Sequence, residues 1–212
     1  MSQHERKRGR RGNGGAAKRP RRHGSGHSWR RDSELLSAAV NGNASAAAQL
    51  LKAGARVNFQ NRAGETPLAS SAAWNELPVV RLLLAHGADP NLADRSGGTP
   101  LMLAAQRASA EVVRELLRRG ADANAADAFG NTVLMHALWR ERDPDQDTIV
   151  RDLLKAGATV TVMNDAGESA SGIAADRRLT HLSRLLIPMS AVGAGGGRAS
   201  GTPGRPTKKA AV

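Results

Sequence analysis

A short pattern returns along this chain at a fixed interval. Thr66-Pro67-Leu68 recurs 33 residues later as Thr99-Pro100-Leu101, and Thr132-Val133-Leu134 follows after another 33. Self-similarity at such a period is the signature of a repeat architecture, in which one small supersecondary unit is copied along the chain. The interval therefore predicts a stack of similar units rather than a single globular core.

A second landmark keeps the same interval. Gly54, Gly87 and Gly120 are each followed by alanine and lie 33 residues apart, and Gly157, also followed by alanine, comes 37 residues later. Glycine adopts the left-handed conformation that ends many helices. These residues are expected to end one helix in each unit, and the longer last interval indicates a four-residue insertion, which we place in residues 140–147.

Each unit has the pattern of two short helices. Thr66 is placed to cap the first turn of a helix, and Pro67 follows at the first helical position, where a missing N–H costs nothing. Apolar residues then recur at i, i+1, i+4 and i+5, which predicts a second helix with one buried stripe. This stripe comprises Val79, Val80, Leu83 and Leu84, then Val112, Val113, Leu116 and Leu117, then Ile149, Val150, Leu153 and Leu154.

Together these residues resemble the ankyrin repeat, most closely in residues 97–129, which run from Gly97-Gly98-Thr99-Pro100-Leu101 to Gly120-Ala121-Asp122-Ala123-Asn124. The resemblance implies an all-α ankyrin solenoid of about five stacked helix-turn-helix units, three full and two capping. Such units cannot bury their apolar faces alone, and stacking gives them a continuous core. The expected domain is residues 32–188, with units at 32–63, 64–96, 97–129, 130–166 and 167–188.

The resemblance also implies a binding surface. In ankyrin proteins the turn tips and the first helix of each pair line a concave face that contacts partners, so we expect a protein–protein interaction scaffold or adaptor. Trp and Arg are enriched among residues that dominate interface energetics. By position, the expected partner-binding residues are Asn41, Arg62, Glu65, Trp74, Arg95, Arg107, Phe129, Trp139, Arg140 and Arg177.

The two ends of the chain carry its net charge of +12. Residues 1–31 hold 11 Lys or Arg and one acid, which gives +10, and residues 189–212 hold 4 basic residues and no acid. The remaining residues, 32–188, therefore sum to −2. Both tails are rich in Gly and poor in large apolar residues, so they are predicted to be disordered.

The basic residues of the first tail allow three interpretations. The segment is a solvated tail or the product of a start codon placed too early; or it binds nucleic acid or another polyanion through phosphate contacts; or it is a nuclear-localisation signal. For the last two, the protein is a nucleic-acid-associated or nuclear-targeted adaptor. The residues concerned are Lys7, Arg8, Lys18, Arg19, Arg21 and Arg22.

The sequence offers little support for chemistry or for a membrane. It contains no Cys, and no nucleophile motif or phosphate loop stands up, so we expect no enzymatic activity, cofactor or metal. The tail pair His23 and His27 and the exposed loop acids Asp143, Asp145 and Asp147 lack the context of a metal site. No apolar run approaches the ~20 residues of a membrane span, and we expect a cytoplasmic monomer, or a nuclear protein in a eukaryotic host or target cell.

Overall fold

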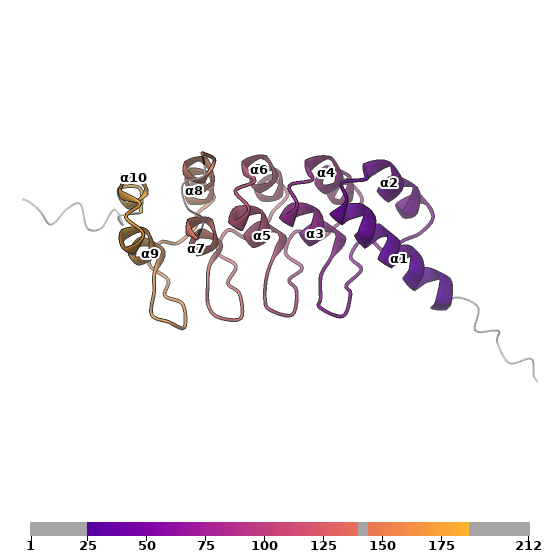
Figure 1. Ribbon diagram of the computed structural model, residues 1–212, viewed down its shortest axis with the longest axis horizontal. Helices are drawn as coiled ribbons and strands as arrows, with labels where there is room; N and C mark the ends of the chain where they lie inside the picture. Colours follow the sequence, from indigo (N-terminus) through magenta and orange to yellow (C-terminus); the bar gives the residue numbers. More distant parts are fainter. Residues whose placement is uncertain (1–24, 140–143, 187–212) are drawn as a thin grey trace, which may run out of the picture.

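The computed structural model describes residues 25–139 and 144–186 (Figure 1). Within these ranges the chain forms ten α-helices and no strand; two isolated bridges join Ala126 to Thr132 and Met163 to Ser169. The helices form five consecutive pairs. They are α1 (Ser25–Val40) with α2 (Ala44–Lys52), α3 (Pro67–Ala73) with α4 (Leu77–Ala85), α5 (Pro100–Gln106) with α6 (Ala110–Arg118), α7 (Val133–Leu138) with α8 (Gln146–Lys155), and α9 (Ala170–Asp176) with α10 (Thr180–Ser183).

The pairs stack side by side into an elongated array (Figure 1). The first helices α1, α3, α5, α7 and α9 form one layer, in which each helix contacts the next, and the second helices form the other layer. The hairpin loops that join successive units all project from the same side, next to the first helices (Figure 1). The predicted all-α solenoid of five units is confirmed.

Each first helix after α1 begins at a hydroxyl cap. The side chain of Thr66 accepts a hydrogen bond from the backbone N–H of Ala69 at 3.0 Å, which satisfies one of the donors that a helix start leaves unpaired. Pro67 occupies the first helical turn and is buried. The same cap recurs at Thr99, Thr132 and Ser169, at 3.3, 3.4 and 3.2 Å.

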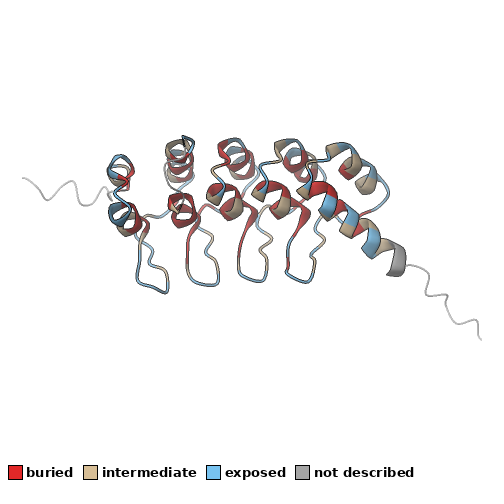
Figure 2. Cartoon of the chain, viewed as in Figure 1, coloured by how far each residue is buried: buried red, intermediate tan, exposed pale blue. Residues whose placement is uncertain are grey.

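The core is a continuous seam through the stack. Val79, Val80 and Leu83 of α4 are fully buried, and the corresponding residues of α6 and α8 are buried as well. Figure 2 shows buried residues in every unit. Each fully buried Val or Leu contributes roughly 1.5–3 kcal/mol. The predicted stripe is confirmed, except that its last residues in α6 and α8, Leu117 and Leu154, are only half-buried.

A ladder of asparagines joins one unit to the next. Asn91 donates from Nδ2 to the carbonyl of Gly120 at 3.0 Å and accepts from the N–H of Asp122 at 2.8 Å. Both partners belong to the loop one unit further along. Asn58 bonds in the same way to Gly87 and Asp89, and Asn124 to Gly157 and Thr159.

The structure departs from the expected boundaries at two places. Helix α1 begins at Ser25, inside residues 1–31, which were assigned to the disordered tail. Asp32, fully buried, accepts from the backbone N–H and the Nε of Arg56, and this contact ties α1 to the end of the first unit. A helix fixed at this point can extend towards its N-terminus at little further cost. Helix α8 begins at Gln146, so the last two residues of the insertion expected at 140–147 are helical.

The other four helix pairs lie inside the units expected for them. Of the expected tails, residues 1–24 and 189–212 lie outside the described residues, as do residues 187 and 188 of the last expected unit. No helix in the described part of the chain has both the length and the apolar composition to cross a bilayer.

Candidate functional site

The tips of the hairpins form one column along the stack, which we call the tip column: Arg62, Glu65, Arg95, Phe129, Asp165 and Glu168. Backbone hydrogen bonds join each tip to the next. The N–H of Arg95 donates to Ala63 at 3.1 Å, that of Ala128 to Ser96 at 2.8 Å, and that of Asp165 to Phe129 at 3.0 Å. Every residue of the tip column is exposed to solvent. The column is therefore a continuous surface held at fixed spacing.

An Asn or Asp at the base of each hairpin shapes its tip. Asp94 Oδ1 accepts from the N–H groups of Ser96 and Gly98, both at 2.8 Å. This is the local turn that Asn and Asp side chains stabilise. Sequence analysis missed these residues, although their spacing of 33, 33 and 37 matches that of the units. They are Asn61, Asp94, Asp127 and Asn164.

The ends of the first helices form a second column, the cap column, which comprises Trp74, Arg107, Trp139 and Arg177. Each is the residue that follows the last turn of its helix. The guanidinium of Arg107 lies over the indole of Trp74, 5.6 Å from the ring centre. Arg177 donates from Nη1 to the carbonyl of Trp139 at 2.6 Å. Side chains from neighbouring units thus meet along the cap column.

The predicted binding residues differ in how much surface they offer. Trp74 is 58 % exposed and Phe129 is 65 % exposed, which is unusual for large apolar side chains. Trp139 is half-buried against the core, and its ring lies edge-on to that of His136 at 4.5 Å. It therefore offers less surface than Trp74. Asn41 is exposed and bonds back to the carbonyl of Ser37, and Arg140 lies outside the described residues.

A buried polar cluster lies behind the tips. His136 Nε2 is 3.0 Å from Asp127 Oδ2, and Asn131 donates to the same oxygen at 3.1 Å. Burial lowers the pKa of His136 below its usual value, and Asp127 only partly opposes this. The pKa of Asp127 is also lowered: burial acts to raise it, but the hydrogen bonds from Asn131, Phe129 and His136 outweigh that effect. The pair is therefore a neutral histidine bonded to a carboxylate at neutral pH.

The second helices carry a separate charge cluster. Glu115 of α6 is buried and contacts Arg118 at 2.6 Å, Arg119 at 3.2 Å, and Arg81 of α4 at 3.7 Å. The hydrogen bond from Arg118 lowers the pKa of the Glu115 carboxyl. A carboxylate already occupies the centre of this cluster, so these charges pair with one another and hold the neighbouring helices α4 and α6 together.

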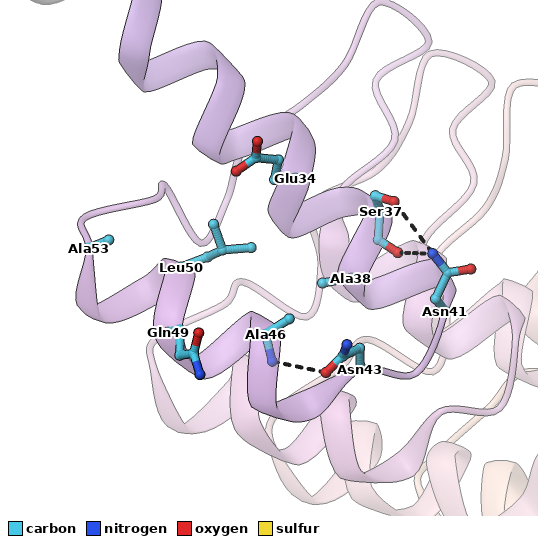
Figure 3. Close-up of a pocket in the computed structure, with 9 residues that line it drawn as sticks. All are labelled: Glu34, Ser37, Ala38, Asn41, Asn43, Ala46, Gln49, Leu50 and Ala53. Atoms are coloured by element: carbon cyan, nitrogen blue, oxygen red, sulfur yellow. Dashed lines mark hydrogen bonds between the residues drawn. The ribbon is translucent and has the colours of Figure 1, made fainter.

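A groove of about 510 Å³ lies between α1 and α2, at the end of the stack (Figure 3). Several of its polar groups already have local partners: Asn43 caps α2 by accepting from Ala46 at 2.9 Å, and Asn41 bonds to Ser37 (Figure 3). Around it lie small or aliphatic side chains, Ala38, Ala46, Leu50 and Ala53. Since Asn41 and Asn43 are bonded to their own helices, the groove suits the outer surface of a terminal unit better than a ligand site.

The remaining candidates from the sequence are the possible metal ligands and the basic residues of the first tail. Within the described residues no group of three His, Asp or Glu side chains could hold a metal ion. Asp147 of the insertion contacts His181 at 2.9 Å, and Asp143 lies outside the described residues. The basic-tail residues Lys7, Arg8, Lys18, Arg19, Arg21 and Arg22 also lie outside them, as do His23 and His27.

Stacked helix pairs, projecting hairpins and a ridged exposed surface define a helical repeat solenoid. The family model for ankyrin repeats, which describes three copies, matches residues 26–94 and 72–164. Together these matches span 26–164, more than half of the 212 residues, and the chain belongs to the ankyrin-repeat family. No curated protein matches the chain.

Proposed function

We propose that this protein is an interaction module that binds another protein across the tip column and the cap column. One observation carries the proposal: two large aromatic side chains, Trp74 and Phe129, are more than half exposed on a stack whose units are fixed to one another. A rigid surface loses little conformational entropy on binding, and aromatic residues supply large contact area. Ankyrin repeats generally mediate protein–protein interactions, which supports this role.

Each of the other predicted binding residues that the structure describes has a place in this proposal. The guanidinium of Arg107 packs over the indole of Trp74, and Arg177 donates a hydrogen bond to the backbone carbonyl of Trp139. Arg62, Glu65 and Arg95 supply exposed charge at the tips, and Asn41 extends the surface towards α1. We propose no catalytic or cofactor-binding role for any of them. A monomeric state and a cytoplasmic location stay predictions.

Affinity capture with the full-length protein tests the proposal. Wild type, W74A, F129A and the control R151A would each be used as bait, with bound proteins identified by mass spectrometry. Arg151 is exposed on the second helix α8, away from both columns. A hot-spot residue contributes about 2 kcal/mol or more, so W74A is expected to weaken binding by roughly 30-fold.

The control separates binding from folding. All four proteins are expected to share one circular dichroism spectrum and one urea midpoint, because the three side chains are exposed. If the same proteins bind wild type, W74A and F129A equally, the two columns do not form the binding surface.

A further inference from the structure

In the described part of the chain, the arginines of the second helices differ from those of the tip column in whether they have an acidic partner. On the second helices, Arg81, Arg118 and Arg119 pair with Glu115, and Arg114 pairs with Asp152 at 3.3 Å. In the tip column, by contrast, no ion pair joins Arg62 or Arg95 to any residue that the structure describes. Both side chains are exposed. The arginines of the second helices stabilise the stack, whereas Arg62 and Arg95 are available to pair with acidic groups of a partner.

Charge along the tip column changes sign from one end to the other. The tips that precede α3 and α5 carry Arg62, Glu65 and Arg95, a net charge of +1, and Glu65 is partly occupied by a 2.6 Å hydrogen bond from Asn61. The tip that precedes α9 carries Asp165 and Glu168, a net charge of −2. Between these charged ends the tip that precedes α7 presents the exposed ring of Phe129.

We propose that the partner segment is acidic where it crosses Arg62 and Arg95, and apolar opposite Phe129. Over the tip that precedes α9 it carries neutral or basic residues. A carboxylate accepts two parallel hydrogen bonds from a guanidinium, and the fixed spacing of the tips places two such groups in line. Acidic residues over Asp165 and Glu168 would meet like charge, and this repulsion fixes the direction in which the segment lies.

The inference rests on the proposed binding surface and adds the chemistry of the partner. Selection from a random peptide display library against the full-length protein tests it. An excess of free synthetic peptide of residues 1–24 removes clones that bind the basic tail. The dissociation constants of the selected peptides are then measured for wild type, R62E/R95E and the matched control K52E/R151E, which changes the charge by the same amount on the second helices.

The selected peptides are expected to carry an acidic cluster beside an apolar residue. R62E/R95E should weaken their binding roughly tenfold or more, and K52E/R151E by less than about threefold. The second variant D165K/E168K should instead bind peptides that are acidic at both ends more tightly than the wild type does.

Three outcomes overturn the inference. The selected peptides lack acidic residues, or R62E/R95E leaves their affinity unchanged, or no peptide is selected. If the peptides lose affinity on W74A or F129A but not on R62E/R95E, the binding surface stands and only its charge preference is refuted. If they respond to none of these substitutions, the proposed function fails as well.

Discussion

Arg81 of α4 and Glu115 of α6 lie 3.7 Å apart and join the second helices of neighbouring units. Glu115 is also held by Arg118 and Arg119 of its own helix, and its side chain is only 4 % exposed. The three arginines stay at least partly hydrated, while the carboxylate is buried among them. The contact therefore depends on Glu115 more than on any one arginine.

Replacement of Glu115 by glutamine is expected to destabilise the stack. The neutral amide keeps the shape but loses charge-assisted hydrogen bonds, so the free energy of unfolding should fall by about 1–2 kcal/mol. E111Q, which changes an exposed residue of the same helix, should cost less than about 0.5 kcal/mol. Urea unfolding at pH 7 followed by circular dichroism measures both.

The same comparison at low pH tests the sign of the pKa shift. Because the pKa of Glu115 is lowered in the folded protein, its contribution is complete above its ordinary pKa and is lost as the pH falls through the lower, folded value. Wild type and E115Q should therefore converge in stability under acid conditions. An equal difference at pH 7 and pH 3 would contradict the shift.

Substitution of two glycines that share one backbone conformation can separate the cost of a left-handed residue from the cost of close packing. Gly87 and Gly97 both have positive φ, +82° and +80°, but a Cβ at Gly87 meets nothing within 4 Å. A Cβ at Gly97 would lie 2.8 Å from the N of Ala128 in the next hairpin. G87A is expected to cost about 1 kcal/mol, and G97A clearly more, about 2–4 kcal/mol, because the neighbouring backbone must move.

Urea unfolding midpoints of G87A and G97A provide the measurement. Equal losses for the two variants would show that hairpin packing adds nothing to the cost of the left-handed conformation.

The buried histidine gives the protein a pH-dependent stability. In the unfolded chain His136 binds a proton near its ordinary pKa of about 6.5, whereas in the folded protein the pKa is lower. Between these two values unfolding takes up a proton, so stability falls as the pH falls, by at most about 1.4 kcal/mol per pH unit.

H136Q should remove this slope between pH 7 and pH 5.5, and H86Q, which changes an exposed histidine, should retain it. Thermal unfolding of wild type and both variants at several pH values makes the comparison. The interpretation is wrong if H136Q keeps the full slope.

The basic tail is expected to bind polyanions independently of the solenoid. Fluorescence anisotropy with labelled duplex DNA should show binding that weakens steeply with salt, by about 0.9 in the logarithmic slope for each phosphate contacted. Deletion of residues 1–24 should abolish it, while W74A should leave it unchanged. DNA binding that survives the deletion would exclude the tail as the contact and would place it elsewhere on the chain.

The fold could be predicted from the sequence because its determinants are local and repeated. Thr66 and Thr99 predict a helix start, and each caps the amide three residues further along the chain. The stripe of Val79, Val80 and Leu83 has the period of a buried helix. The extension of α1 to Ser25 has no such signal. The contact of Asp32 with Arg56, 24 residues away, holds this helix against the first unit, and no short pattern reveals it.

The surface was predictable in position but not in detail. The 33-residue register places Trp74 and Arg107 at equivalent helix ends, yet it does not say that their side chains stack. Nor does it distinguish Trp74, which is exposed, from Trp139, which turns towards His136. These differences arise from side-chain contacts, between units for Trp74 and within one unit for Trp139. The asparagines and aspartates at the hairpin bases did have a signal, because they recur in register.

The ladder of Asn58, Asn91 and Asn124 makes the first three junctions of the stack chemically alike. Each asparagine offers the same pair of bonds to whichever loop comes next. A gene that lost one internal unit, from Gly97 to Phe129, would encode a shorter array in which Asn91 meets Gly157 just as it now meets Gly120. The number of repeats can thus change by whole units during evolution, because the contact between neighbouring units is kept.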